Sequence, residues 1–444
     1  MNTNINKKAV LELAVGIGFL LLLQGGYFPE AYLPVGMVLS MVILLQSRRP
    51  DPDYKIIGLL AGILLLYLVS GVINRIDGRQ YVRLFYIGDI ILFYIWLCQK
   101  TYSQREIEVG VSYAVAVMEF IGMLAYLGCP FSGVILSNRF MGTSQYANVT
   151  AMILCVSMLL LKSGQVEEMQ RLRLIHAVFF LLTLSVGGFL IYGGIICYLM
   201  WHDPVDRKKR FCRELLFWLV AAIVAVLIYG TCFFLRQRLA TAVVFFILIW
   251  ISGKWTEFEN RLLSAKWVAG VSIGSLFMGV VAVVCLIRQR AAATLMERMQ
   301  QMQDGIRVLS RNPLFGIGMG EWSRQQDQYR TYDYSVSLIH NTYLQVGVDA
   351  GLLAMVLVCL LIYYEIRYLQ KEKNIYKKAI LFGAFLHGFV DVDGFFLGYM
   401  VILLMVLKST QNTKQEAMQM KYRLWFVPIV LLYGFAWFRY VSGR

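Results

Sequence analysis

Long apolar runs, each bounded by a short polar or charged stretch, recur along almost the whole chain. A helix needs roughly 20 apolar residues to cross a bilayer. Several of the runs are shorter than that, and we expect about 12–15 crossings. We therefore predict an all-α fold, a polytopic transmembrane helical bundle. The runs 174–201 and 378–407 each fit either two spans or one bent unit. The candidate spans are 9–27, 30–46, 55–73, 83–99, 107–127, 146–161, 174–186, 187–201, 214–235, 239–252, 268–287, 341–363, 379–391, 393–407 and 424–438.

One long polar segment, 288–340, interrupts this pattern and is predicted to be a large extracytoplasmic loop. Apolar residues spaced three and four apart begin at Leu295 and predict a short amphipathic helix inside it. Pro313 would end that helix. Residues three or four apart are neighbours on a helix. On this helix Arg298, Gln301, Gly305 and Met302 would therefore neighbour each other on one face.

The composition agrees with a membrane protein. Hydrophobic residues make up 59% of the chain and charged residues only 16%, with a mean hydropathy of +0.62. Soluble domains carry about 25% charged residues. We therefore expect one integral membrane domain over 1–444. The net charge of +15 is read as a topology signal, since no nucleic-acid-binding motif accompanies it.

The basic residues also predict an orientation. Lys and Arg mark cytoplasmic loops, and alternating the spans from a cytoplasmic N-terminus places all 16 lysines inside. The 15 basic residues left outside are all arginines. A guanidinium binds phosphate through two parallel hydrogen bonds, which an ammonium cannot do. Phosphate recognition is one explanation of the outer arginines, and anchoring of helix ends at the interface is the other.

The outer segment ends in His340-Asn341, directly before a new apolar run. A neutral imidazole can take up a proton near pH 7, although a histidine at an interface also serves as a polar anchor. Asn341 fits either a supporting role or a helix cap. Gly316 and Gly318 allow a tight backbone, as a plain turn or as a phosphate cradle. His387 and Asp391, four residues apart, would share one helical face and pair, as a structural pair inside the membrane or as supporting residues of the site.

Several of these strings resemble one family. Arg298, the run Asn312 to Gly318, the run His340 to Gln345 and Asp349 to Leu352 are similar to the signature of the O-antigen ligase/polymerase superfamily. Arg139-Phe140-Met141-Gly142 with the later Asn148 and Ala151 resembles its Arg-x-x-Gly…Asn-x-x-Ala segment. His387 to Asp391 resembles its late His-x-x-x-Asp helix. The resemblance covers about 139–407.

The resemblance implies a bacterial inner-membrane glycosyltransferase whose active site faces outside. Such an enzyme transfers a glycan from an undecaprenyl-diphosphate carrier to a hydroxyl of a glycan or lipid acceptor, as a polymerase or a ligase. By this resemblance His340 is the general base and Arg298 the first diphosphate-binding residue. Arg238, Arg236 and Arg139 are further candidates. No metal, cofactor or nucleic acid is expected, while membrane lipids and a flippase or chain-length regulator are possible partners.

The chain departs from the family at two places. Asp349 stands where Glu is usual, and Val186 stands where the family often has the arginine of Ser-Arg-Gly. Arg236 or Arg238 could supply the missing charge. The alternative function is a transporter or flippase for a lipid-linked or anionic solute, with discontinuous helices at 187–188 and 391–394.

Overall fold

The computed structural model describes residues 5–46, 50–164, 167–202, 207–255, 257, 294–370, 374–408 and 426–442. The expected span 268–287, together with Arg288 and Arg290, lies outside the described residues. The described chain is mainly helical, which confirms the predicted class, with one pair of two-residue strands, β1 (Ile135–Leu136) and β2 (Arg139–Phe140). It divides into two compact units, and each is described by itself.

Unit 1 comprises residues 1–22, 105–294 and 374–384. Helix α7 lies at its centre and packs against α6, α9 and α10. An aromatic cluster joins the strand residue Phe140 to α7, because its ring stands edge-on to that of Phe179, and Phe179 stacks on Phe245 of α10. The helices of this unit are α1 (Lys7–Leu22), α5 (Gln104–Tyr126), α6 (Ala147–Ser163), α7 (Glu167–Leu182), α8 (Val186–His202), α9 (Arg207–Tyr229), the π-helix η3 (Gly230–Phe234), α10 (Arg238–Gly253) and most of α15 (Ile375–His387).

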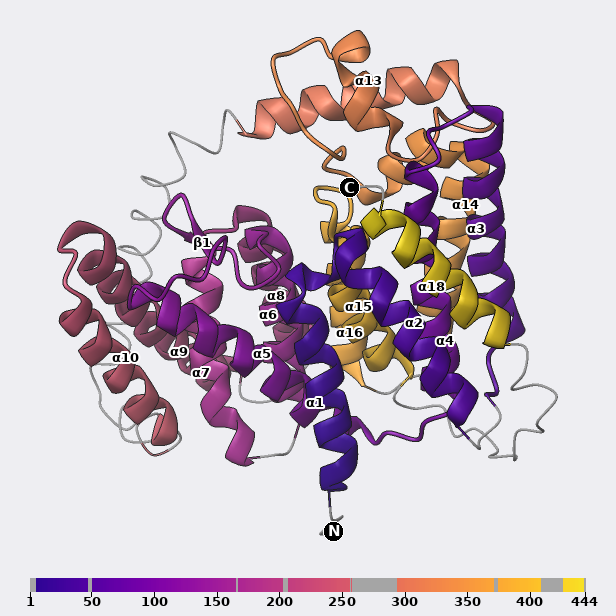
Figure 1. Ribbon diagram of the computed structural model, residues 1–444. Coiled ribbons are helices and arrows are strands. Elements are labelled where there is room, and N and C mark those ends of the chain that lie inside the picture. Colours follow the sequence, from indigo (N-terminus) through magenta and orange to yellow (C-terminus); the bar gives the residue numbers. More distant parts are fainter. Residues whose placement is uncertain are drawn as a thin grey trace. The chain divides into compact units, whose positions relative to one another are not determined.

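Unit 2 comprises residues 23–104, 295–373 and 385–444. Its helices α3 and α14 run side by side, and α2 packs against both α4 and α18 (Figure 1). Asp53 starts α3 by accepting a hydrogen bond from the Lys55 backbone N–H, as an N-cap residue should. The elements of this unit are η1 (Gln24–Gly26), α2 (Pro29–Leu45), α3 (Tyr54–Ile73), η2 (Gln80–Arg83), α4 (Leu84–Cys98), the helix over 294–311, α13 (Glu321–Tyr329), α14 (Thr342–Gln370), η4 (Asp393–Phe395), α16 (Leu397–Lys408) and α18 (Phe426–Ser442).

Many of these helices suit a membrane. Among the described residues, five are long and apolar enough to cross one: 54–73, 80–98, 104–126, 211–234 and 342–370. Shorter apolar helices of 10–17 residues accompany them. The chain is thus a multi-pass membrane protein by length and composition of its helices, while the expected 12–15 crossings and the orientation stay predictions.

Both runs that could be one bent span are two helices. Helix α7 ends at Leu182 and α8 begins at Val186, with Leu184 between them at a φ of +50°. In the second run α15 ends at His387 and α16 begins at Leu397, with η4 between them. The sequence predicted one continuous helix from His387 to Asp391. That prediction is wrong, because α15 ends at His387. The Thr342 N–H donates to the carbonyl oxygens of Gly388 and Asp391, so α14 begins where α15 stops.

The glycine-rich turn after Pro313 is built into unit 2. The N–H groups of Gly316 and Gly318 donate to the carbonyl oxygens of Asn312 and Asp349. Gly316 has a φ of +63°, and a Cβ there would lie 2.2 Å from the carbonyl oxygen of Val348. This geometry is that of a structural turn packed on α14, the plainer of the two readings of the glycines, because the two amides are directed at protein oxygens.

Helix α14 is interrupted at Gly351, which has a φ of 87° and a ψ of 173°. A Cβ there would lie 2.1 Å from the Leu314 carbonyl oxygen, and the Leu352 N–H donates to the Pro313 carbonyl oxygen. Two glycines four residues apart, such as Gly347 and Gly351, are typical of close packing on a neighbouring helix. At Gly351 the close partner is instead the 313–315 turn. Its Pro313 carbonyl oxygen accepts the hydrogen bond of the Leu352 N–H, where the helix is interrupted.

Candidate functional site

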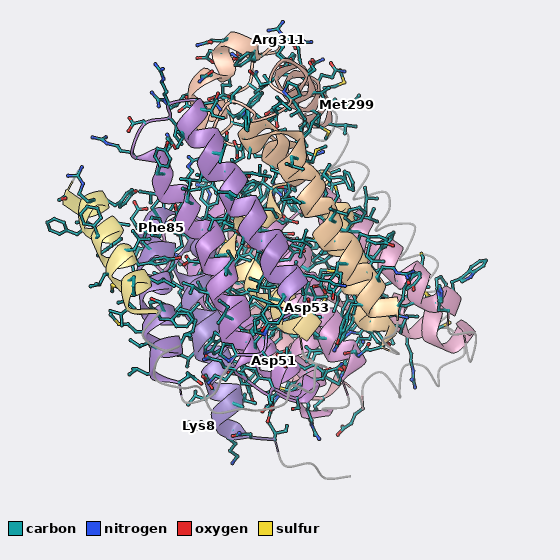
Figure 2. The ribbon with its side chains drawn as sticks, turned by 90° about the vertical axis from the view of Figure 1, so that its right-hand side faces the viewer. Lys8, Asp51, Asp53, Phe85, Met299 and Arg311 are labelled. Atoms are coloured by element: carbon teal, nitrogen blue, oxygen red, sulfur yellow. The ribbon has the colours of Figure 1, made fainter. Side chains whose placement is uncertain are left out.

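The helix over 294–311 carries the predicted face with Arg298, Gln301, Met302 and Gly305, and these residues face two other segments of unit 2. Arg298 contacts residues 390–391, whereas Gln301 contacts His340. The Met302 sulfur lies 3.9 Å from the Asn341 side-chain nitrogen. Figure 2 shows Met299 and Arg311 of this helix at one end of the unit, with Asp51 and Asp53 toward the other. The candidate site is therefore at one end of the helices.

Arg298 is anchored by the turn after α15. Its Nη1 donates to the Val390 carbonyl oxygen at 2.6 Å, and its Nη2 lies 3.0 Å from Oδ2 of Asp391. Asp391 is fully buried, and the Arg298 side chain is 19% exposed. A guanidinium has five N–H donors. Two of them hold this turn, so the charge is fixed in place at a partly open position.

His340 stands beside this ion pair. Its Nδ1 lies 2.7 Å from Oε1 of Gln301, and its backbone N–H donates to the same oxygen at 3.3 Å. Burial lowers the pKa of His340 below its usual value. Arg298 lowers it further, and Asp391 acts in the opposite direction. The imidazole is therefore neutral near pH 7, the form that accepts a proton.

The backbone around His340 is held from α14. The Ile339 N–H donates to Oε1 of Gln345, whose Nε2 donates to Oδ1 of Asp349 at 2.8 Å. Asn341 caps α14, because its Oδ1 accepts from the Leu344 N–H at 2.9 Å. The capping interpretation of Asn341 thus holds. The shorter Asp349, where the family usually has Glu, reaches Gln345 one helical turn away.

His387 and Asp391 do not form the pair that the sequence predicted. The Nδ1 of His387 is hydrogen-bonded to Oδ2 of Asp393, and Asp391 faces Arg298. The four-residue rule fails here because α15 ends at His387, so the residues after it no longer follow helical geometry. Both members of the His387–Asp393 pair are buried. Sequence reasoning missed Asp393, although it lies only two residues beyond a candidate.

The three remaining candidate arginines belong to unit 1. Arg139 lies against the turn before α8: its Nε donates to the Thr183 carbonyl oxygen at 2.9 Å, and its Nη2 lies 3.4 Å from the Leu184 carbonyl oxygen. Arg238 lies against Gly128, where a Cβ would come within 2.5 Å of its Cζ. Arg236 is exposed, with a φ of +53°. Of the three, Arg139 is the one with hydrogen bonds to the turn that precedes Val186 in the described structure.

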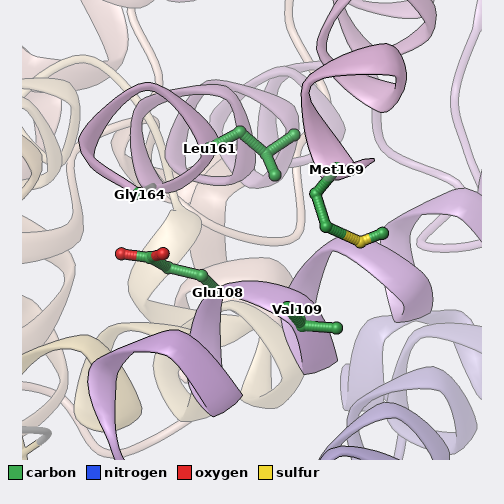
Figure 3. A pocket seen from close by; sticks show the side chains of 5 residues that line it. All are labelled: Glu108, Val109, Leu161, Gly164 and Met169. Atoms are coloured by element: carbon green, nitrogen blue, oxygen red, sulfur yellow. The ribbon is translucent and has the colours of Figure 1, made fainter. Parts of the chain in front are cut away.

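Unit 1 also has a small depression at the junction of α5, α6 and α7. Figure 3 shows the carboxylate of Glu108 pointing toward Gly164, with Val109, Leu161 and Met169 around it. The Ser163 hydroxyl donates to Glu108 at 3.1 Å. The rest of the lining is apolar, so this feature is a helix junction rather than a place for polar substrates.

A family model described as O-antigen ligase matches residues 226–359. The resemblance predicted from the sequence is confirmed over that segment, which includes Arg236, Arg238, Arg298, His340 and Asn341. Arg139, His387 and Asp391 lie outside the match but inside the range 139–407 that the sequence suggested. No curated protein matches the chain. The match supports a membrane protein of glycan transfer, in the broad sense of that family.

Proposed function

We propose that the chain transfers a glycan from a polyprenyl-diphosphate carrier, such as undecaprenyl diphosphate, to a hydroxyl of a sugar or lipid acceptor. The observation that carries the proposal is His340, held by Gln301 beside the Arg298–Asp391 pair. His340, Gln301 and Arg298 lie in the segment that matches the O-antigen ligase model. A base and a fixed cation are the two groups this reaction needs.

The proposed reaction is a single displacement. The acceptor oxygen attacks the anomeric carbon, the bond from that carbon to the diphosphate oxygen breaks, and the anomeric centre inverts. The acceptor proton moves to Nε2 of His340, and the bonding electron pair leaves with the diphosphate. Arg298 stabilises the charge that develops on the leaving diphosphate. Arg139, Arg236 and Arg238 are proposed as further phosphate contacts, and the reaction is proposed to need no metal ion.

The proposed setting is the outer face of a bacterial inner membrane, with the N-terminus in the cytoplasm. The donor would arrive after a flippase has moved it across, and a chain-length regulator could act on the product. Polymerase and ligase activities use the same chemistry and differ in the acceptor, which is a growing lipid-linked glycan in one case and a terminal acceptor in the other.

The test is a transfer assay in liposomes with an undecaprenyl-diphosphate oligosaccharide and excess EDTA. His340→Ala should abolish the product, while His202→Ala, a change of an exposed histidine at the end of α8, should leave it intact. A ladder of longer lipid-linked glycans identifies a polymerase, and transfer to one added acceptor identifies a ligase. Movement of lipid or solute across the bilayer without a new glycosidic bond would refute the proposal and favour the transporter.

A further inference from the structure

The Gln301 side chain is fully buried and lies between Glu297 and His340. The amide nitrogen of Gln301 contacts the first residue and its oxygen the second. Its Nε2 donates to Oε1 of Glu297 at 3.0 Å, one helical turn earlier. Its Oε1 faces the backbone N–H of His340 at 3.3 Å and Nδ1 of the same residue at 2.7 Å. A carboxylate oxygen accepts and a backbone N–H donates. Both contacts therefore fix the amide in the same orientation.

This orientation decides where the proton of the neutral imidazole lies. Nδ1 faces an oxygen that only accepts, so Nδ1 must carry the hydrogen, and the ring lone pair is then on Nε2. Rotating the buried amide by half a turn would set its NH₂ group against the His340 backbone N–H and its oxygen against Glu297. Such a rotation would lose both polar contacts of a buried group, which is costly.

We propose that Gln301, oriented by Glu297, is a positioning residue that fixes His340 with its proton on Nδ1 and presents the Nε2 lone pair to the acceptor hydroxyl. The role of Nε2 toward the acceptor hydroxyl rests on the proposed function, whereas the assignment of the proton to Nδ1 does not. The neutral amide has a second consequence. It orients the ring without adding a negative charge that would stabilise the imidazolium, so the histidine stays a neutral base.

Among the residues that the structure describes, Arg298 and Asp391 are charged groups that act on His340, and Glu297 lies behind the amide. Gln301→Glu would replace the amide by a carboxylate at hydrogen-bond distance from the ring. An adjacent opposite charge favours the protonated imidazole. The acidic limb of the rate profile should then move to higher pH by about one unit, with a lower rate at neutral pH.

The chain offers a matched control in α13. Gln325 donates through its Nε2 to Glu321 at 2.8 Å, again four residues apart on a helix, and no contact with a histidine accompanies it in the described structure. Gln325→Glu makes the same chemical change next to the same kind of neighbour. It should leave the pH profile and the His340 signals as they are in the wild type.

The direct experiment is ¹⁵N NMR of the histidine-labelled protein, in which the two ring nitrogens of each tautomer are distinguished. The chain has four histidines, and the signal lost in His340→Ala identifies the one of interest. The wild type should show the Nδ1–H tautomer, and Gln301→Ala should show a mixture with Nε2–H. An Nε2–H wild type, or an unchanged tautomer in Gln301→Ala, would overturn the proposal.

The transfer assay adds an independent readout. Gln301→Ala should lower kcat by about 10- to 100-fold, the contribution of a well-placed base being about 10²–10⁴-fold, with little change in KM. If His340→Ala itself transfers glycan normally, the proposed function fails, and the NMR result still decides the role of Gln301. If Gln301→Glu does not fold, the smaller and uncharged Gln301→Ala carries the test.

Discussion

Asp304 provides a prediction that is independent of any reaction. Its carboxylate is fully buried on the helix over 294–311 and accepts hydrogen bonds from the segment that leads to His340. The Tyr334 hydroxyl lies at 2.7 Å, the Thr331 hydroxyl at 2.9 Å and the Thr331 backbone N–H at 3.0 Å. Burial raises the pKa of Tyr334, as does its hydrogen bond to Asp304, so that the hydroxyl remains a donor. Asp304→Ala should release the segment 330–340.

The magnitude follows from these contacts. Each of the three hydrogen bonds contributes about 1 kcal/mol net. Arg307, whose side chain is 42% exposed, adds a salt bridge worth about 0–1 kcal/mol. A loss of about 3 kcal/mol corresponds to roughly a hundredfold increase in the population of the open segment, at about 1.4 kcal/mol per factor of ten. Tyr334→Phe removes one bond and should produce a several-fold increase.

Hydrogen–deuterium exchange with mass spectrometry on peptides covering 330–340 measures this population. Asp327→Ala is the matched control, because the Asp327 side chain is 74% exposed and pairs with Arg330 at 3.2 Å on the surface. Protection should fall in Asp304→Ala and Tyr334→Phe, in that order, and stay unchanged in the control. Less than a threefold change in Asp304→Ala would show that these hydrogen bonds do not hold the segment.

Three further predictions concern the site and the turn beside it. The acidic limb of the transfer rate should lie below pH 6.5, the usual pKa of histidine, because burial lowers the pKa of His340 and keeps the ring neutral at lower pH; a rate profile from pH 5 to 8 measures it. Arg298→Lys should reduce transfer severely, because one ammonium cannot hold both the Val390 carbonyl and Asp391 and still present charge to a diphosphate, and initial rates at saturating donor measure this. Gly351→Ala should lower stability by about 2 kcal/mol or more, measured by thermal unfolding in detergent, because the positive φ and the nearby carbonyl oxygen leave no room for a Cβ.

Each of these has an outcome that contradicts it. A limb above pH 7 would mean that the titrating group is not a buried neutral histidine. Full activity of Arg298→Lys would make Arg298 a structural anchor for the 390–391 turn. An unchanged melting temperature in Gly351→Ala, set beside Gly58→Ala as a control at a helical glycine with no atom within 4 Å of its Cβ, would show that the turn can move aside.

Local patterns correctly predicted the helix over 294–311 and the face that four of its residues share. Arg298, Gln301, Met302 and Gly305 all face other segments of unit 2, and Gly305 lies against Ile339 and Leu344. The three- and four-residue spacing is enough for this, because it depends only on helix geometry. The end of the helix before Pro313 was predictable for the same local reason.

Partners distant in sequence were not predictable from such patterns. Nothing near Arg298 indicates that it faces Asp391, 93 positions away, or that the stretch after His387 leaves the helix and brings Asp393 to it. Asp304 carries no local sign of its partners either. These contacts depend on how separate helices pack, and a single sequence does not contain that arrangement in a form that spacing rules reveal.

The Ser70 hydroxyl lies 2.5 Å from the Phe315 carbonyl oxygen and 2.7 Å from that of Asp349, which are 245 and 279 positions later in the chain. Synthesis at about 5–20 residues per second separates these positions by on the order of tens of seconds. During that interval α3 is already made, but the two carbonyl oxygens that accept from the Ser70 hydroxyl have not yet been synthesised. The contacts that hold the 313–320 turn in unit 2 can form only after α14 has been inserted. A ribosome stalled before residue 349 should therefore hold a chain whose α3 is still open to modification by membrane-permeant probes at position 70.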